Sequence, residues 1–283
     1  MLRTGSLLGN CVGGCQTEFV EVRELEVDGS STAYRVAGEG EPVVLVHGLS
    51  GSWRWWGSVL EPLTERRCVY VPDLPRLGRR LPAAELTGWF GRWLDAAGLE
   101  RVDLIGHSLG GLVAAELAGE QPRRARRLAL IAPAGIPCGT SLLSRSARLA
   151  GTLYDLRRWL PTVVGDALRA GPLSLLRGAL FASERDLTVD LASIRAGTLL
   201  VWGEDDRLLP PRIAAEWLRV LPGSRLVRLH CGHVPMWEAP RELASCLLTF
   251  LDEEVADDLG DEVGSRVMRR MRLTGDDDQP TVR

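Results

Sequence analysis

A serine framed by glycines lies at residues 106–110, in the sequence G-H-S-L-G. An apolar run, Val102 to Ile105, precedes it, and a run rich in helix-forming residues follows from Leu112. The pattern indicates a strand, a sharp turn and a helix, in which small neighbours hold Ser108 at the carboxyl end of a sheet. Ser108 would then sit above a helix N-terminus, where free N–H groups favour negative charge. This placement suits a hydrolytic nucleophile.

A serine hydroxyl is a weak nucleophile until a base takes its proton, and the chain offers four histidines as that base. His107 lies inside the turn, where its position directs it away from the serine, and His47 ends an earlier strand-like run. His233 follows the last predicted strand in C-G-H-V-P, so its loop ends at the same edge of a parallel sheet as Ser108. We therefore predict that His233 is the general base, with His230 as the second candidate.

A carboxylate is needed to hold the histidine tautomer and to stabilise the imidazolium. Three carboxylates, Glu204, Asp205 and Asp206, directly follow the buried strand-like run that ends at Trp202. The order serine, acid, histidine is expected for a nucleophile at a strand–helix turn. From the residues alone, either Asp205 or Asp206 is the acid, and the other carboxylates belong to a solvated turn.

An oxyanion formed during attack needs two N–H donors aimed at it. The N–H of Leu109 directly follows the nucleophile at the helix start and is the first predicted donor. The loop of residues 47–51, H-G-L-S-G, follows a strand-like run, and its glycines let the backbone approach a substrate closely. Leu49 in this loop is the second predicted donor.

The segments that must position these groups alternate between strand and helix patterns. Residues 19–27 and 32–37 flank Asp28-Gly29-Ser30, which predicts an antiparallel hairpin. Further strand-like runs, separated mostly by amphipathic helical segments, lie at 43–46, 68–71, 102–105, 128–132, 199–202 and 226–229. This alternation predicts an α/β protein with a mostly parallel, doubly wound sheet of about eight strands.

The domain organisation follows from changes in pattern along the chain. Residues 17–136 and 192–252 form the predicted core, and residues 137–191 hold only short amphipathic helices. These helices fall where the carboxyl edge of the sheet should lie, so we predict an inserted helical lid. Residues 1–16 are expected to be a flexible extension, and residues 253–283 an acidic, disordered tail.

The composition excludes several classes of function. The 283 residues carry a net charge of −3, all basic residues are arginine, and no nucleic-acid partner is expected. Six scattered cysteines indicate reduced thiols, and the C-x3-C spacing of Cys11 and Cys15 lacks a second pair for structural zinc. We expect no metal and no cofactor. With no predicted signal peptide or membrane span we expect a cytoplasmic protein, and the sequence leaves its oligomeric state open.

Five motifs together make the chain similar to the α/β-hydrolase superfamily over about residues 19–251. They read V-H-G-L-S-G, V-P-D-L-P-R-L-G-R, G-H-S-L-G-G, W-G-E-D-D-R-L-L-P and C-G-H-V-P-M-W-E-A-P. The resemblance implies the α/β-hydrolase fold, a capped member of it, and a triad of Ser108, Asp206 and His233. The chain departs from the family pattern at Arg76-Leu77-Gly78, where G-H-G is usual, in a loop near the site entrance.

The resemblance also limits the reactions expected of this chain. A serine nucleophile disfavours epoxide hydrolases and haloalkane dehalogenases, which use aspartate there. His47, Gly48, Trp53 and Trp237 are predicted to line an apolar pocket, although tryptophans at such positions also pack helices onto sheets. We therefore expect a serine hydrolase that cleaves a carboxylic ester of a small to medium, uncharged, hydrophobic substrate. The alternatives are a C–C bond hydrolase of a ring-fission product, a small-molecule binding protein and an acyltransferase.

Overall fold

A computed structural model describes residues 20–137, 142–187 and 190–253. The predicted extension 1–16, with Cys11 and Cys15, and all but the first residue of the predicted tail lie outside the described residues. The eight strands are β1 (Glu21–Val27), β2 (Ser30–Ala37), β3 (Pro42–Val46), β4 (Cys68–Pro72), β5 (Val102–His107), β6 (Ala125–Ile131), β7 (Gly197–Gly203) and β8 (Arg225–Leu229).

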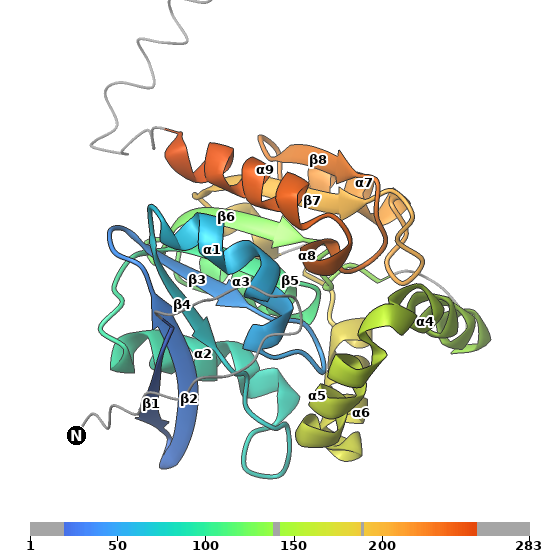
Figure 1. Ribbon diagram of the computed structural model, residues 1–283, viewed down its shortest axis with the longest axis horizontal. Coiled ribbons are helices and arrows are strands. Elements are labelled where there is room, and N and C mark those ends of the chain that lie inside the picture. The colour runs from blue at the N-terminus through green and yellow to red at the C-terminus, as the bar shows by residue number, and fades with distance from the viewer. Residues whose placement is uncertain (1–19, 138–141, 188–189, 254–283) are drawn as a thin grey trace, which may run out of the picture. The chain divides into compact units, whose positions relative to one another are not determined.

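These strands form one sheet in the order β1-β2-β4-β3-β5-β6-β7-β8 (Figure 1). β1 with β2 and β2 with β4 are antiparallel pairs, and every pair from β4 to β8 is parallel. After β3, the chain places β4 on one side of that strand and then β5 to β8 in succession on the other side, as in a doubly wound sheet. The structure thus confirms the predicted mostly parallel sheet of about eight strands.

The hairpin of β1 and β2 shows how local sequence fixes the chain path. Val27 pairs with Ser30, so Asp28 and Gly29 alone form the turn. Both have positive φ, 52° and 73°, the backbone twist that suits a two-residue hairpin and that Asp-Gly tolerates. The predicted hairpin is therefore confirmed, with its second strand beginning at Ser30, two residues before the predicted start at residue 32.

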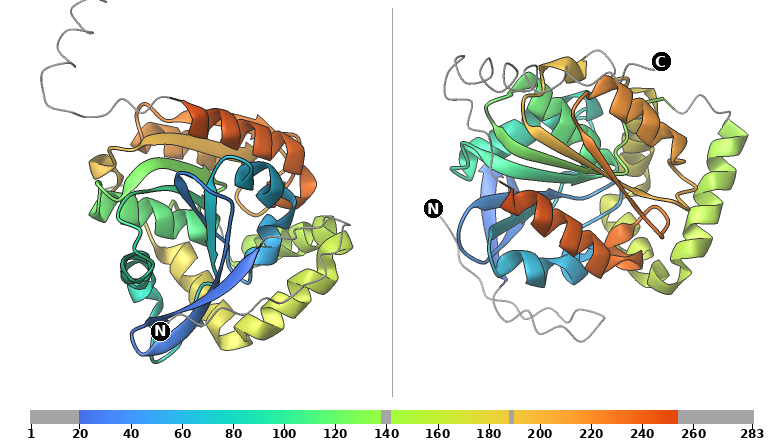
Figure 2. Two further views of the ribbon diagram at one scale, coloured as in Figure 1. Left: turned by 60° about the vertical axis from the view of Figure 1, so that its left-hand side comes forward. Right: turned by 90° about the horizontal axis from the view of Figure 1, so that it is seen from above.

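Helices cover both faces of the sheet, and the second view of Figure 2 shows the sheet between the two layers. One apolar layer is formed by α2, α3 and α7, and the other by η1, α1, α8 and α9. Their bounds are η1 (Trp53–Trp56), α1 (Gly57–Thr64), α2 (Leu86–Ala96), α3 (Leu109–Glu120), α7 (Arg212–Val220), α8 (Pro235–Glu238) and α9 (Pro240–Asp252), and the short helix η2 (Ala83–Glu85) precedes α2. Of these, α3 is buried over its first ten residues because it lies between the sheet and α2.

A helical insertion separates β6 from β7. It comprises α4 (Leu142–Asp155), η3 (Leu156–Trp159), α5 (Leu160–Ala170), α6 (Pro172–Glu184) and η4 (Asp190–Ser193). In Figure 1 the arrowheads of β6 and β8 point toward the side of the molecule that carries α4, α5 and α6. The exposed large apolar side chains of the described residues all lie on these three helices. No helix in the described ranges has the length and apolarity needed to cross a membrane.

Candidate active site

Ser108 lies in a strained turn between β5 and α3. Its φ of 52° and ψ of −115° are rare for a residue with a side chain, and such strain persists only where the surroundings enforce it. A Cβ on Gly106 would lie 2.4 Å from the carbonyl oxygen of Gly110, and one on Gly110 would lie 2.2 Å from that of Val46. The turn therefore needs glycine at both positions, as the G-x-S-x-G spacing predicts.

Three residues from distant parts of the chain meet at this edge of the sheet. Nε2 of His233 lies 3.2 Å from Oγ of Ser108, and Nδ1 of His233 lies 2.7 Å from Oδ2 of Asp206. Ser108 follows β5, Asp206 follows β7 and His233 follows β8. Because these strands are parallel, all three residues lie at the edge of the sheet formed by the carboxyl ends of the strands. With Nδ1–H donating to the carboxylate, Nε2 is free to accept the serine proton.

Asp206 is fixed by its own turn. Its Oδ1 accepts hydrogen bonds from the N–H groups of Leu208 (2.9 Å) and Leu209 (2.8 Å), which leaves Oδ2 for the histidine. Asp206 is 2% exposed, whereas Asp205 is exposed. Of the two acids that the residues alone left open, the structure places Asp206 against His233.

His230, the second candidate base, faces solvent. Its side chain is 94% exposed, and its Nδ1 lies 2.5 Å from a carboxylate oxygen of Glu204. Glu204 is itself exposed. This pair therefore belongs to the solvated turn, and His233 is the histidine that the fold brings to Ser108.

The loop that carries His233 is held by two residues whose positioning role sequence reasoning missed. Glu238 accepts hydrogen bonds from the N–H groups of Gly232 (2.8 Å) and Val234 (2.9 Å). Nε2 of His107 donates to the backbone carbonyl of His233 over 2.9 Å, so the histidine beside Ser108 contacts the loop that carries His233. The glutamate in the motif G-H-V-P-M-W-E was the available signal for the first contact.

Burial keeps the other two histidines of the site neutral. Desolvation lowers the pKa of His47, and it lowers the pKa of His107 well below the usual value, with the nearby His233 adding to the effect. The N–H of Leu74 donates to Nε2 of His47 (2.9 Å), so the proton of His47 is on Nδ1, which donates to the carbonyl of Gly48 (2.9 Å). Neither residue is a competing base for Ser108.

A cavity of about 320 Å³ opens beside Ser108. Its walls are mostly apolar and come from the core loops and the insertion: Leu49, Leu109, Ala134, Ile136, Pro137, Arg148, Leu149, Ala179, Ala182, Ser183, Leu208 and Leu209. The backbone N–H groups of Leu49 and Leu109 donate to no acceptor within the described chain. Both predicted oxyanion donors are thus free and belong to residues of the cavity wall beside the serine.

The four residues predicted for the pocket lie outside the lining of this cavity. Gly48 packs behind the serine, where an added Cβ would be 3.2 Å from Cβ of Ser108. The ring of Trp237 lies against Trp55, with 4.7 Å between ring centroids, and Trp53 lies beneath the guanidinium of Arg35. Together with the buried His47, they support the loops around the site.

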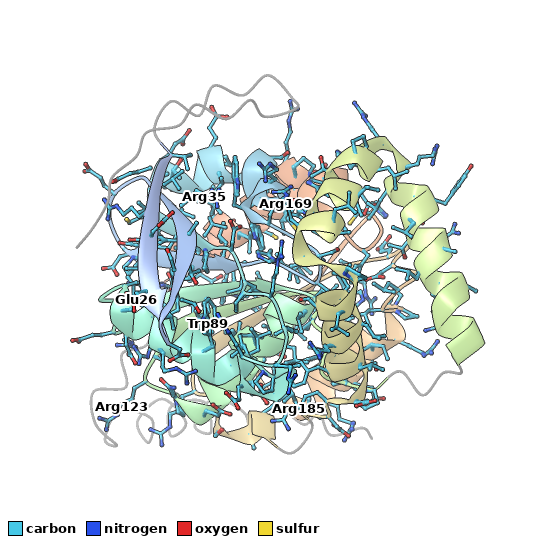
Figure 3. The ribbon with its side chains drawn as sticks, turned by 90° about the horizontal axis from the view of Figure 1, so that it is seen from below. Glu26, Arg35, Trp89, Arg123, Arg169 and Arg185 are labelled. Atoms are coloured by element: carbon cyan, nitrogen blue, oxygen red, sulfur yellow. The ribbon has the colours of Figure 1, made fainter. Side chains whose placement is uncertain are left out.

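A buried carboxylate ties the insertion to the segment that directly follows the predicted oxyanion loop, residues 47–51. Asp166 on α5 is 2% exposed, and its Oδ2 accepts from Oγ of Ser52 and from Nε1 of Trp55, both at 3.0 Å. Arg169 also pairs with Asp166, while Arg185 at the end of α6 pairs with Glu116 of α3. Figure 3 shows Arg169 and Arg185 toward opposite ends of the insertion. Nothing in the sequence near Asp166 indicates a partner 111 to 114 residues away.

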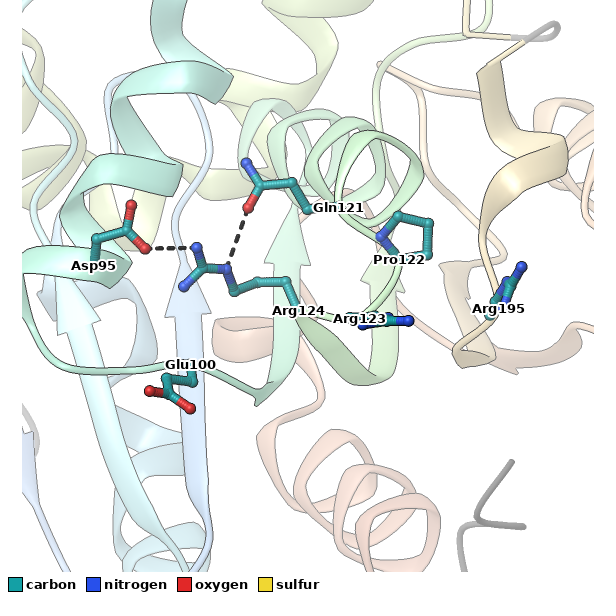
Figure 4. Close-up of a pocket in the computed structure, with 7 residues that line it drawn as sticks. All are labelled: Asp95, Glu100, Gln121, Pro122, Arg123, Arg124 and Arg195. Carbon is teal, nitrogen blue, oxygen red and sulfur yellow. Dashed lines mark hydrogen bonds and ion pairs between the residues drawn. The ribbon is translucent and has the colours of Figure 1, made fainter. Parts of the chain in front are cut away.

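A second hollow, of about 640 Å³, lies near the start of β6, between α2, α3 and the segment before β7 (Figure 4). It is lined by Asp95, Glu100, Gln121, Pro122, Arg123, Arg124 and Arg195. Arg124 is already bonded there to Asp95 (2.5 Å) and Gln121 (3.2 Å). It contains no serine, histidine or cysteine, and we assign it no chemistry.

Cys231 lies two residues from His233 but is not poised to react. Burial raises the pKa of this thiol to about 12, with the carboxylates of Glu238 and Asp206 contributing. The thiolate is the nucleophilic form, so Cys231 stays inert at neutral pH. No cluster of three potential metal ligands occurs among the residues that the structure describes.

Comparison with known proteins gives a consistent result. The sequence profile of the "Alpha/beta hydrolase family" matches residues 43–245. The 2-hydroxy-6-oxo-2,4-heptadienoate hydrolase of Pseudomonas putida is 30% identical over 261 residues, which cover 80% of this chain and 94% of that protein. The pimeloyl-acyl-carrier-protein methyl ester esterase of Nitrosomonas europaea is 28% identical, covering 77% and 98%. A putative lipase of Acinetobacter baumannii has a similar structure, with a TM-score of 0.70, 24% identity and coverage of 82% and 91%.

Proposed function

The chain belongs to the alpha/beta hydrolase family, and from this premise we propose that it is a serine hydrolase that cleaves carboxylic esters of small to medium, largely apolar substrates. The observation that carries the proposal is the path from Asp206 through His233 to Ser108, which ends at the cavity. The relatives include a methyl ester esterase and a dienoate hydrolase, so the family admits both ester and C–C substrates.

In the proposed mechanism, Nε2 of His233 takes the hydroxyl proton as Oγ of Ser108 attacks the carbonyl carbon. The N–H groups of Leu49 and Leu109 stabilise the negative charge on the carbonyl oxygen. Asp206 stabilises the imidazolium, which then gives its proton to the departing alcohol. A water molecule, activated by the same histidine, releases the acid from the acyl-enzyme.

The insertion acts in this proposal as a lid. Leu149, Ala179 and Ala182 form part of the cavity wall, so the insertion supplies one side of the substrate site. Gly178 of α6 packs so closely that an added Cβ would lie 2.5 Å from Cδ1 of Leu49. Because α6 rests on the oxyanion loop, movement of the insertion would change both access to Ser108 and the position of the Leu49 N–H.

Labelling with a fluorophosphonate tests the class of reaction. We expect covalent modification of Ser108 in the wild type and none in Ser108→Ala. Ser183→Ala is the matched control, because Ser183 also lines the cavity but its hydroxyl donates to the carbonyl of Leu180 (2.9 Å). A series of p-nitrophenyl esters then measures chain-length preference. Unchanged ester hydrolysis by Ser108→Ala would contradict the proposal.

A second candidate is hydrolysis of a C–C bond in a ring-fission product on the same triad. The 30% identity with the P. putida dienoate hydrolase favours it. Turnover of a 2-hydroxy-6-oxo-dienoate, followed by loss of its visible absorbance, would select this reaction over ester cleavage. Tight binding without turnover of either class would instead indicate a small-molecule binding protein, and faster product formation with added alcohols an acyltransferase.

A further inference from the structure

One cation lies in the wall of the mostly apolar cavity. Arg148, on α4, lines the space beside Ser108 together with Leu149, Leu208 and Leu209. Its Nη1 is buried and has no hydrogen-bond partner. Its side chain forms no ion pair with any residue that the structure describes. The cavity therefore contains a guanidinium whose hydrogen-bonding capacity the protein leaves unused.

Four other arginines, from the insertion and from the loop after β7, form ion pairs or hydrogen bonds with protein groups. Arg169 pairs with Asp166, Arg185 pairs with Glu116, and Arg207 lies 3.3 Å from a carboxylate oxygen of Asp155. Arg157 donates to the carbonyl of Tyr154 at 3.1 Å. Arg148 differs from these four because it lines the cavity and its guanidinium forms no ion pair or hydrogen bond with a residue that the structure describes.

A buried guanidinium nitrogen without an acceptor is costly because arginine stays protonated and the N–H groups on that nitrogen lose their hydration. Buried polar groups in folded proteins almost always have partners. Among the buried side-chain nitrogens without a partner in the described part of the chain, that of Arg148 alone belongs to a residue that lines the cavity beside Ser108, and this position calls for an explanation. A bound anion supplies one, because a carboxylate accepts two parallel hydrogen bonds from the planar guanidinium. The apolar walls would strengthen this pairing by excluding water.

We propose that Arg148 binds a carboxylate on the substrate, at the end remote from the bond that Ser108 attacks. The inference rests on the proposed function and narrows it: the substrate is apolar along its length but ends in a negative charge, rather than being uncharged throughout. It applies equally to an ester and to a C–C substrate. A single cation with apolar neighbours suits a monoanion such as a carboxylate.

Matched substrates test this directly. The acyl side is tested with the mono-p-nitrophenyl esters of adipic and suberic acids, each compared with the ester whose free acid is replaced by a carboxamide of the same length. The alcohol side is tested with 4-acetoxybenzoate against 4-acetoxybenzamide. The variants are Arg148→Gln and Arg148→Lys, and the control is Arg158→Gln, which removes an exposed arginine of the same insertion.

We expect wild type and Arg158→Gln to prefer the carboxylate in at least one series. Arg148→Gln should lower kcat/KM for that carboxylate by about 10- to 100-fold, mainly through KM, and change the carboxamide by less than about 3-fold. Arg148→Lys should restore part of the preference, because it keeps the charge without the planar fork.

Two results would overturn the inference: no preference for the carboxylate in either series, or a preference that survives in Arg148→Gln. Fluorophosphonate labelling of Ser108 and the melting temperature are measured for each variant, so loss of folding is detected separately. If Ser108 is labelled and the carboxamides are hydrolysed without a carboxylate preference, the carboxylate site is wrong while the serine hydrolase proposal stands. If Ser108 is not labelled and no ester is cleaved, the proposed function itself fails.

Discussion

His107 donates a hydrogen bond from Nε2 to the backbone carbonyl of His233 over 2.9 Å, and the two rings lie 4.9 Å apart between centroids. The residue before Ser108, the proposed nucleophile, thus holds the backbone of the proposed base. Because His107 is the last residue of β5, the contact joins the centre of the sheet to the loop after β8. It fixes where the imidazole of His233 stands relative to Ser108.

This contact predicts a pH dependence of stability. The pKa of His107 is well below its usual value in the folded state because burial disfavours the charged form. In the unfolded state it titrates near 6.5, so as pH falls below that value the unfolded chain takes up a proton that the folded chain does not. His107 should therefore reduce the free energy of unfolding by about 1–2 kcal/mol between pH 7 and pH 5.

Urea titrations at pH 7 and pH 5 measure this loss in wild type and in His107→Gln, whose amide keeps a donor for the His233 carbonyl. We expect a smaller pH-dependent loss in the variant. His230→Gln is the control, since it replaces an exposed histidine in the same way. An identical pH dependence in wild type and His107→Gln would show that the buried imidazole does not resist protonation.

The carboxylate of Asp206 predicts a large effect on rate with little effect on binding. Asp206→Asn keeps the shape of the side chain but replaces the carboxylate opposite Nδ1 of His233 with an amide, whose NH₂ group can donate to Nδ1 and so favour the other histidine tautomer. The imidazolium also loses its counter-charge. We expect kcat for ester hydrolysis to fall by about 10³- to 10⁴-fold. Asp205→Asn, one residue away and exposed, should change kcat by less than about 2-fold. Equal effects of the two substitutions would reject Asp206 as the acid.

Strands and the proposed triad were predictable where the signal was local. Asp28-Gly29 marks a hairpin because both residues tolerate positive φ. The start of β6 was missed by three residues because Arg126 and Arg127 interrupt its apolar pattern. Both arginines lie close to the buried carboxylate of Asp103 on β5, at 2.7 Å and 3.5 Å, so they occupy a strand despite their charge.

Contacts between remote segments were beyond the reach of sequence pattern. The predicted pocket residues lie within or shortly after the loops that carry Leu49 and His233, but the cavity wall is completed by α4 and α6 of the insertion. Where the insertion lies depends on pairings such as that of Asp166 on α5 with Trp55, which neither segment specifies alone. The cation Arg148 could be placed in the site only once α4 had been positioned.

The turn that carries Ser108 predicts a strong and specific glycine requirement. In Gly110→Ala the new methyl group would meet the carbonyl oxygen of Val46 at 2.2 Å, and backbone cannot move aside as a flexible side chain can. We expect a loss of about 2–3 kcal/mol in the free energy of unfolding, or no soluble folded protein. Gly57→Ala is the control, because nothing lies within 4 Å of its Cβ position and its backbone is helical, so it should be neutral or slightly stabilising.

The Asp166 contact predicts that stability and catalysis are coupled through the insertion. Asp166→Ala leaves the hydroxyl of Ser52 and the indole N–H of Trp55 buried without their acceptor, which should cost about 2–4 kcal/mol of unfolding free energy. Because Ser52 follows the loop that carries Leu49, the oxyanion donor should also move, lowering kcat.

Asp155→Ala is the matched control, since its ion pair with Arg207 involves partly exposed side chains and should be worth less than about 1 kcal/mol. Chemical denaturation and ester kinetics at a temperature where both variants stay folded separate the two effects. If Asp166→Ala were destabilised but retained wild-type kcat, the insertion would stabilise the fold without positioning the oxyanion loop.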